Sequence, residues 1–229
     1  MGIFYIDEII KKYILFFVGN PTLINYIYMH IKDVNCFDSG CACPLVGRAL
    51  PEVELDVYHK DEIGKLNLSS FLGKWVVLFF YPADFTFVCP TELEELAGLY
   101  KEFQKLNAEI VSVSTDTAFT HKAWHDNSPA IGKVEYPMAA DHNGNLSRKL
   151  GIYVEEEGLS LRGTFIVNPE GIIKSVEVHD NSIGRSAKET FRKLQAAQFV
   201  ATHAGKVCPA SWVPGNDTLT PGVDLVGKI

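Results

Sequence analysis

The apolar run Trp75-Val76-Val77-Leu78-Phe79-Phe80 constrains the fold of this chain more than any other stretch. Consecutive apolar residues without alternation predict a strand that is covered on both faces, as in the centre of an α/β sheet. A turn at Pro82 follows, and Cys89 then stands at the expected start of a helix. The unpaired N–H groups and the dipole at a helix start favour a thiolate there, which is the reactive form of cysteine. The sequence therefore predicts a reactive sulfur beyond the end of a buried strand.

The helix after this turn is expected to run from about Cys89 to Leu106. Its apolar residues recur at three- and four-residue steps and form one stripe, as in a helix packed on a core. The stripe consists of Leu93, Leu96, Tyr100, Phe103 and Leu106. Pro90 suits the first helical position, where no N–H is needed.

Strand and helix patterns alternate along the rest of the chain. The expected strands are 53–58, 109–114, 136–140 and a hairpin of 163–167 with 172–178. The expected helices are 115–126, a short one that ends near 151, and 187–201, and residues 66–72 predict a turn or a short helix. This order predicts one α/β domain over residues 44–205, with a mixed central sheet flanked by helices. Residues 206–229, rich in Pro and Gly, are expected to form an extended C-terminal tail.

Residues 1–43 form an atypical N-terminal extension. No charge interrupts 13–30, and Lys11 and Lys12 precede apolar residues as in a signal peptide, but Asp7 and Glu8 do not fit that pattern. Three interpretations stay open: a disordered extension, which we favour, a targeting or anchoring segment, and a membrane span. The spacing of Cys36, Cys41 and Cys43 matches no recognised zinc pattern, so we assign them no role.

Composition narrows the possible functions. A net charge of −7 argues against nucleic acid or an anionic membrane as the main partner. Five cysteines are too few and too unevenly spaced for a disulfide-stapled secreted scaffold. No phosphate-binding glycine motif occurs, so no nucleotide or flavin cofactor is expected and electrons must come from another protein. His121 and His125 stand four residues apart without a third ligand, and we expect a structural role rather than a metal site.

Three motifs, in order, resemble those of the peroxiredoxins, which are thiol peroxidases with a thioredoxin-like fold. The sequence 80–92, FYPADFTFVCPTE, is similar to their active-site loop, 207–212 to the region of their second cysteine, and 224–229 to their C-terminal end. The resemblance covers almost all of residues 44–229. Within the family the chain looks like a typical 2-Cys member, most similar to the bacterial alkyl hydroperoxide reductase peroxidase subunit.

The resemblance implies a role for each matching residue. Cys89 would attack the peroxide as a thiolate and become a sulfenic acid. Pro82 would shield the loop, Thr86 would place its hydroxyl beside the peroxide, and Arg162 would stabilise the thiolate and polarise the peroxide. From the residues alone, Arg162 would have been assigned to the surface beside a strand. Glu92 matches a position that helps to hold this arginine.

The resemblance also makes Cys208 the resolving cysteine, which forms a disulfide with Cys89 of a partner subunit. A homodimer follows, and the family commonly forms decamers. The implied substrates are hydrogen peroxide and organic hydroperoxides, and the implied reductant is a flavin disulfide reductase or a thioredoxin. No metal or other cofactor is implied, and a cytoplasmic location is expected, although residues 1–43 leave organellar or membrane targeting open.

Two departures from the family and two rival functions qualify this prediction. Residues 130–133 and the tail lack the Gly-Gly-Leu-Gly and Tyr-Phe motifs of members that are easily over-oxidised, which implies lower sensitivity to peroxide. A thiol–disulfide oxidoreductase is the first rival, but no C-x-x-C motif supports it. The second rival is an oligomeric holdase chaperone, whose activity would survive replacement of Cys89 by serine.

Overall fold

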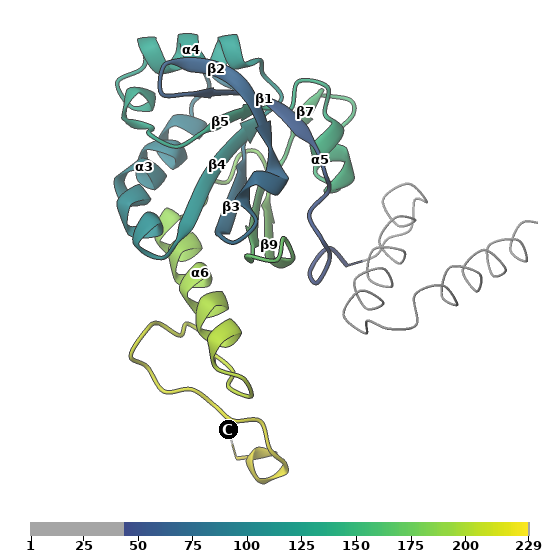
Figure 1. Cartoon of the computed structure of the whole chain (residues 1–229), viewed down its shortest axis with the longest axis vertical. Coiled ribbons are helices and arrows are strands. Elements are labelled where there is room, and N and C mark those ends of the chain that lie inside the picture. The colour runs from purple at the N-terminus through teal and green to yellow at the C-terminus, as the bar shows by residue number, and fades with distance from the viewer. Residues whose placement is uncertain (1–43, 229) are drawn as a thin grey trace, which may run out of the picture. The chain divides into compact units, whose positions relative to one another are not determined.

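A seven-stranded mixed sheet forms the centre of the computed structural model, which describes residues 44–228 (Figure 1). Its strand order is β2-β1-β5-β4-β3-β8-β9. The strands are β1 (Glu54–His59), β2 (Glu62–Asn67), β3 (Trp75–Phe80), β4 (Ala108–Ser114), β5 (Met138–Ala140), β8 (Arg162–Val167) and β9 (Ile173–His179), and β6 (Tyr153–Val154) pairs with β7 (Leu159–Ser160) separately. Strand β3 pairs parallel with β4 and antiparallel with β8, which confirms the predicted mixed sheet.

Helices cover the sheet and account for the continuous apolar run in β3. The helices are α3 (Cys89–Lys105), α4 (Ala118–Asn127), α5 (Asn145–Lys149) and α6 (Ala187–Thr202). Val77 and Phe79 belong to a core cluster that includes buried residues of α3 and α6, whereas Val76, Leu78 and Phe80 belong to a second cluster that includes α5. All of the strand is therefore buried, as predicted for a central strand.

The predicted elements agree with the structure except at weakly patterned segments. The α3 stripe packs inward, with four of its five members buried and Leu106 partly buried against them. Residues 62–67 form a strand that the sequence did not reveal, because this edge strand is almost entirely exposed and shows no apolar alternation. The segment 66–72 accordingly begins as the end of that strand and continues as a 3-10 helix, Leu68–Phe71.

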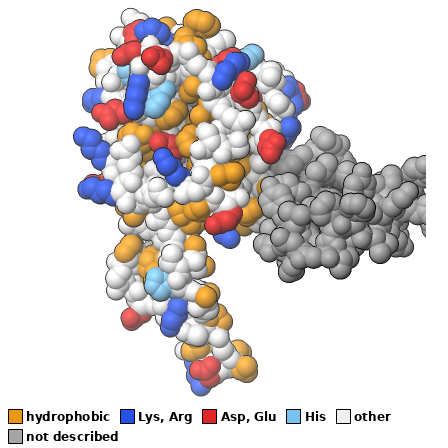
Figure 2. Space-filling model, viewed as in Figure 1, with side chains coloured by type: hydrophobic (Ala, Val, Ile, Leu, Met, Phe, Trp, Pro, Cys, Tyr) orange, Lys and Arg blue, Asp and Glu red, His pale blue; other side chains and the backbone are white. Residues whose placement is uncertain are grey.

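The C-terminal tail follows α6 and extends away from the sheet (Figure 1). Residues Val207 and Leu219 form an isolated bridge that folds the tail back on itself. Trp212 is buried, while Val223 and Val226 are largely exposed. Figure 2 shows apolar and charged side chains side by side along this segment.

Two features are absent from residues 44–228. None of the helices in this part of the chain combines the length and apolar character needed to cross a membrane. No group of three or more acidic, His or Cys side chains there is arranged to hold a metal ion. The predictions for residues 1–43, including those for Cys36, Cys41 and Cys43, lie outside the described residues.

Candidate active site

Cys89 is the first residue of α3 and its side chain is fully buried. The loop 81–88 brings the chain from the end of β3 to this position, as the sequence predicted. Pro90 occupies the first turn, and Val88 provides no side-chain cap for the helix. The sulfur therefore lies at the positive end of a helix dipole, where negative charge is stabilised.

Arg162 lies beside this sulfur rather than on the surface. Its Nη1 donates to the Cys89 Sγ at 3.3 Å and to the Glu92 Oε2 at 2.7 Å. Its Nε and Nη2 both donate to the Asn181 carbonyl oxygen, at 3.0 and 2.8 Å, so the guanidinium is fixed in one orientation. Because a guanidinium does not lose its proton in proteins, it provides a permanent positive charge to stabilise a thiolate.

A second buried arginine, Arg185, completes the charge cluster and was not predicted. The Glu92 carboxylate accepts from Arg185 Nε at 3.0 Å and from Arg185 Nη2 at 3.1 Å, in addition to Arg162. The Arg185 guanidinium also stacks 3.4 Å over the Phe79 ring. Burial lowers the pKa of Arg185, and the bonds to Glu92 oppose that shift. Arg185 stands two residues before the helix predicted to begin at 187, and nothing in that position distinguishes it from a surface charge.

The cluster has a chemical consequence. Two guanidinium groups and one carboxylate give Arg162, Arg185 and Glu92 a combined charge of +1 in a site that is almost closed to water. Unbalanced charge in a buried site is costly, and negative charge on the neighbouring Cys89 sulfur would neutralise it. The arrangement therefore favours a nucleophilic sulfur.

Pro82 and Thr86 lie in the same loop as Cys89. Pro82 is buried and Thr86 is half-buried. The Thr86 hydroxyl donates to the Ala83 carbonyl oxygen at 2.9 Å, so its own oxygen stays available as an acceptor. The Tyr81 carbonyl oxygen accepts from Ser160 at 3.1 Å, which ties the start of the loop to β7.

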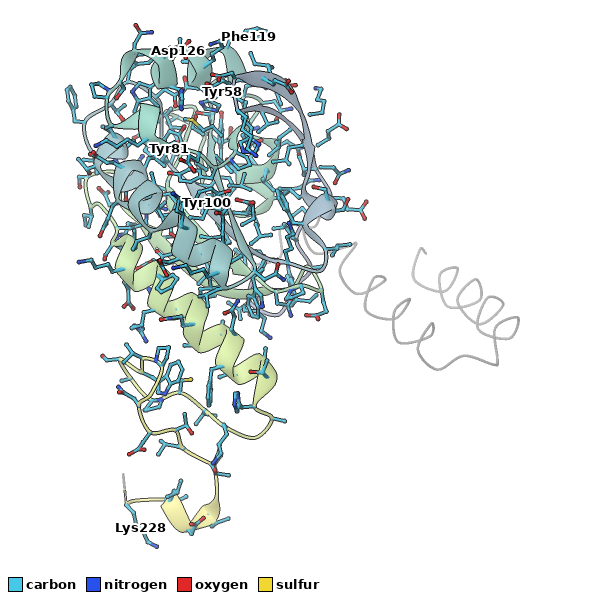
Figure 3. All side chains as sticks on the ribbon, turned by 60° about the vertical axis from the view of Figure 1, so that its left-hand side comes forward. Tyr58, Tyr81, Tyr100, Phe119, Asp126 and Lys228 are labelled. Atoms are coloured by element: carbon cyan, nitrogen blue, oxygen red, sulfur yellow. The ribbon has the colours of Figure 1, made fainter. Side chains whose placement is uncertain are left out.

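A buried hydrogen-bond network holds the loop at Asp84. Asp84 accepts from the Tyr81 hydroxyl at 2.8 Å and lies 2.7 Å from His121 Nδ1, while its own N–H donates to Asp116 at 2.7 Å. Figure 3 places Tyr81 in the interior of the domain, and burial raises its pKa well above the ordinary value. The other ring nitrogen of His121 bonds to the Ala139 carbonyl oxygen, so both of its nitrogens have protein partners.

His125 belongs to a second hydrogen-bond network, around Tyr58. Its two ring nitrogens contact the Tyr58 hydroxyl at 3.1 Å and the Val134 carbonyl oxygen at 3.2 Å. Tyr58 also donates to Asp61, and burial raises the Tyr58 pKa to about 12. The two histidines thus belong to separate hydrogen-bond networks.

In the described structure, Cys208 lies away from the Cys89 site, against α6. Its sulfur is half-buried in the tail, 3.9 Å from the Ala196 carbonyl oxygen of α6, and both Cys89 and Cys208 are free thiols. Burial raises the pKa of the Cys208 thiol, and the nearby Arg192 charge opposes this rise. The structure therefore brings Arg162, Glu92 and Cys89 together but does not bring Cys208 to them.

The fold and this site together define a cysteine-dependent redox enzyme with a thioredoxin-like fold. The AhpC/TSA family model matches residues 46–176, and a model described as the C-terminal domain of 1-Cys peroxiredoxin matches residues 196–227. The chain belongs to the AhpC/TSA family: it is a peroxiredoxin, a thiol-dependent peroxidase. The predicted family, fold class and peroxidase function are confirmed.

Individual relatives agree with this assignment. The chain is 50% identical over 185 residues to alkyl hydroperoxide reductase C of Pseudomonas aeruginosa, which is 81% of this chain and 99% of that protein. It is 56% identical over 185 residues to the Salmonella typhimurium protein of the same name, with the same coverage. The crystal structure of Enterococcus faecalis AhpC is similar with a TM-score of 0.71 and 50% identity, over 73% of this chain and all of that one. Reduced Plasmodium vivax 2-Cys peroxiredoxin has a TM-score of 0.74 and 32% identity, over 77% and 93%.

Proposed function

We propose that this peroxiredoxin reduces hydrogen peroxide and organic hydroperoxides with Cys89 as the attacking cysteine and Cys208 of a second subunit as the resolving cysteine. The observation that carries the proposal is the fixed Arg162 guanidinium, 3.3 Å from the Cys89 sulfur. Such a donor can stabilise both the attacking thiolate and the charge that develops on the peroxide oxygen.

In the first step the Cys89 thiolate attacks one peroxide oxygen. An S–O bond forms, the O–O bond breaks, and the other oxygen leaves with the electron pair and takes up a proton as water or an alcohol. Cys89 is left as a sulfenic acid. Arg162 would stabilise the departing oxygen, Thr86 would orient the peroxide through its available hydroxyl oxygen, and Pro82 would keep water out of the loop.

In the second step the Cys208 thiolate attacks the sulfenic sulfur. An S–S bond forms, the S–O bond breaks, and hydroxide leaves and is protonated to water. Two electrons from a partner protein then reduce the disulfide, and we propose a flavin disulfide reductase of the alkyl hydroperoxide system or a thioredoxin as that partner. Because Cys89 is buried in α3 and Cys208 is docked on α6, both segments must open locally before the sulfurs meet.

Exposed apolar groups support an oligomeric state. Phe85 and Phe87 in the active-site loop and Phe119 on α4 are 57%, 93% and 73% exposed. Strand β9 is the last strand of the sheet, and an unpaired edge is a template for pairing with another chain. We propose a homodimer that assembles further into a decamer.

We also propose a cytoplasmic location, since enzymes that reduce disulfides keep thiols reduced there.

A non-reducing gel after one equivalent of peroxide tests the proposal. The full chain should give a disulfide-linked dimer, and Cys89→Ser and Cys208→Ser should each abolish it. Mixing the two single variants should restore a linked dimer, because each then supplies the sulfur that the other lacks. A band at monomer mass throughout would overturn the intersubunit disulfide, and peroxide consumption that survives Cys89→Ser would overturn the role of Cys89.

A further inference from the structure

One face of α6 holds the tail segment that carries Cys208. Arg192, Ala196 and Phe199 recur at four- and three-residue steps, so their side chains lie on the same face of the helix. Cys208 lies against the Ala196 carbonyl oxygen, and the Trp212 ring lies 4.8 Å from the Phe199 ring between centroids. The tail is thus docked on its own helix over one stripe.

Arg192 makes the polar contact of this docked state. Its Nη1 donates to the Trp212 carbonyl oxygen at 2.9 Å. Its Nε and Nη2 each donate to one oxygen of Glu189 at 2.7 Å, so the guanidinium is held in a bidentate pair. A guanidinium fixed on two sides is pre-organised to accept the tail, and less side-chain freedom is lost when the tail docks.

The position of Arg192 also matters for the sulfur. Its positive charge opposes the rise in pKa that burial causes at Cys208. Charged or titratable groups on α6 and the tail include Glu189, Lys193, His203 and Lys206. Of these, Glu189 pairs with Arg192 and Lys193, and Lys206 bonds to Thr220 within the tail.

We propose that Arg192 is a positioning residue for the resolving cysteine: it acts as a latch that keeps the Cys208 segment docked on α6 and limits how often the tail is released. The inference rests on the proposed function, in which Cys208 must leave this position to reach the sulfenic acid of Cys89. A weaker latch should release the tail more often and speed formation of the disulfide. Since over-oxidation competes with the disulfide, fewer Cys89 residues should then become sulfinic acid.

Alkylation of the reduced full chain measures the release directly. The reaction of Cys208 with iodoacetamide is measured in a Cys89→Ser background by mass spectrometry of the Cys208 peptide over a range of alkaline pH. The rates are compared at the high-pH plateau, where the thiol is fully ionised and the rate reports how accessible Cys208 is. Arg192→Gln should raise the plateau about three- to ten-fold, the range for a lost charge-assisted hydrogen bond at a partly exposed site. Arg192→Lys should recover part of the protection, and Glu189→Gln should give a smaller increase. Lys188→Gln removes a positive charge from an exposed position of the same helix and should change nothing.

Two results would overturn the latch. One is a plateau for Arg192→Gln that equals that of Lys188→Gln. The other is faster alkylation of Cys89 as well, measured in a Cys208→Ser background, which would mean that the whole domain has loosened. With both cysteines present, Arg192→Gln should also lower the sulfinic fraction at high peroxide. If alkylation accelerates but the parent chain forms no linked dimer with peroxide, the latch stands and the resolving role of Cys208 fails.

Discussion

At the scale of single residues, the site depends on a carboxylate that is shared by two arginines. Glu92 receives hydrogen bonds from Arg162 and Arg185 while its side chain is only 2% exposed. Removing one member of this cluster is therefore costly, because a buried charge is left without its partner. Position within the cluster, rather than residue type, gives each of these side chains its function.

Replacing Glu92 by glutamine should lower the free energy of unfolding by about 3–5 kcal/mol, because two buried guanidinium groups lose their counter-charge. Glu94→Gln is the matched control on the same helix, since Glu94 pairs with Lys133 at a surface where both side chains are about half exposed. The control should cost about 0–1 kcal/mol. Urea unfolding followed by circular dichroism measures both, and equal losses would contradict the buried pair.

Arg162→Gln should slow peroxide reduction about 10²- to 10³-fold, the usual effect of removing one fixed donor from a developing oxyanion. The fold should persist, because Glu92 keeps its bonds to Arg185. Stopped-flow peroxide consumption measures the rate, with Arg148→Gln as a surface control that loses contacts with Glu155, the Asn143 carbonyl oxygen and the Tyr153 ring. A loss of less than tenfold would show that Arg162 is not the principal donor.

The residues of the site differ in how far sequence could reveal them. Cys89 was found from its place between a buried strand and a helix start, which is a local pattern. Arg162 was assigned only through the family resemblance, because its burial depends on contacts with Asn181 and Glu92 that lie far away in sequence. Arg185 has the same dependence on distant partners, and it was missed.

At the scale of elements, the strength of the apolar pattern decided what could be predicted. Strand β3 and helix α3 are packed on the core, so their sequences show a continuous run and a stripe. Strand β2 lies at the sheet edge and is held by backbone pairing with β1, which no side-chain pattern records. The separate β6–β7 pair was missed because strands of two residues are too short to show a pattern.

The docked tail should respond to pH through Cys208. A thiol is uncharged when protonated, so the pKa raised by burial means that docking is stabilised below the ordinary thiol pKa. This stabilisation is lost as the pH rises through the raised value. In Cys89→Ser, the midpoint of the pH profile for iodoacetamide reaction at Cys208 should therefore lie above that of the urea-unfolded chain. Trp212→Ala removes the ring packed on Phe199 and should move the midpoint toward the unfolded value. Identical midpoints in all three samples would contradict the effect of burial.

At the scale of the whole molecule, the chain combines a rigid site with a tail that must move. The active-site loop is tied down by Ser160, Asp116 and the buried network around Asp84. The tail is held by fewer contacts, chiefly Arg192, Trp212 and the bridge between Val207 and Leu219. Segments with few buried contacts open at lower free energy than core elements. We therefore expect the tail to open more readily than the loop.

Residues 44–229 should be sufficient for peroxidase activity. Both family matches fall within this range, and the relatives align over 185 residues with nearly their full length. A chain that begins at residue 44 should therefore keep the melting temperature of the domain. Its rate of peroxide consumption should lie within about twofold of that of the full chain, a smaller change than the tenfold that corresponds to about 1.4 kcal/mol of activation free energy. Differential scanning calorimetry and stopped-flow kinetics on the two proteins measure these quantities. A loss of linked dimer or a tenfold slower rate in the shorter chain would assign residues 1–43 a part in the enzyme itself.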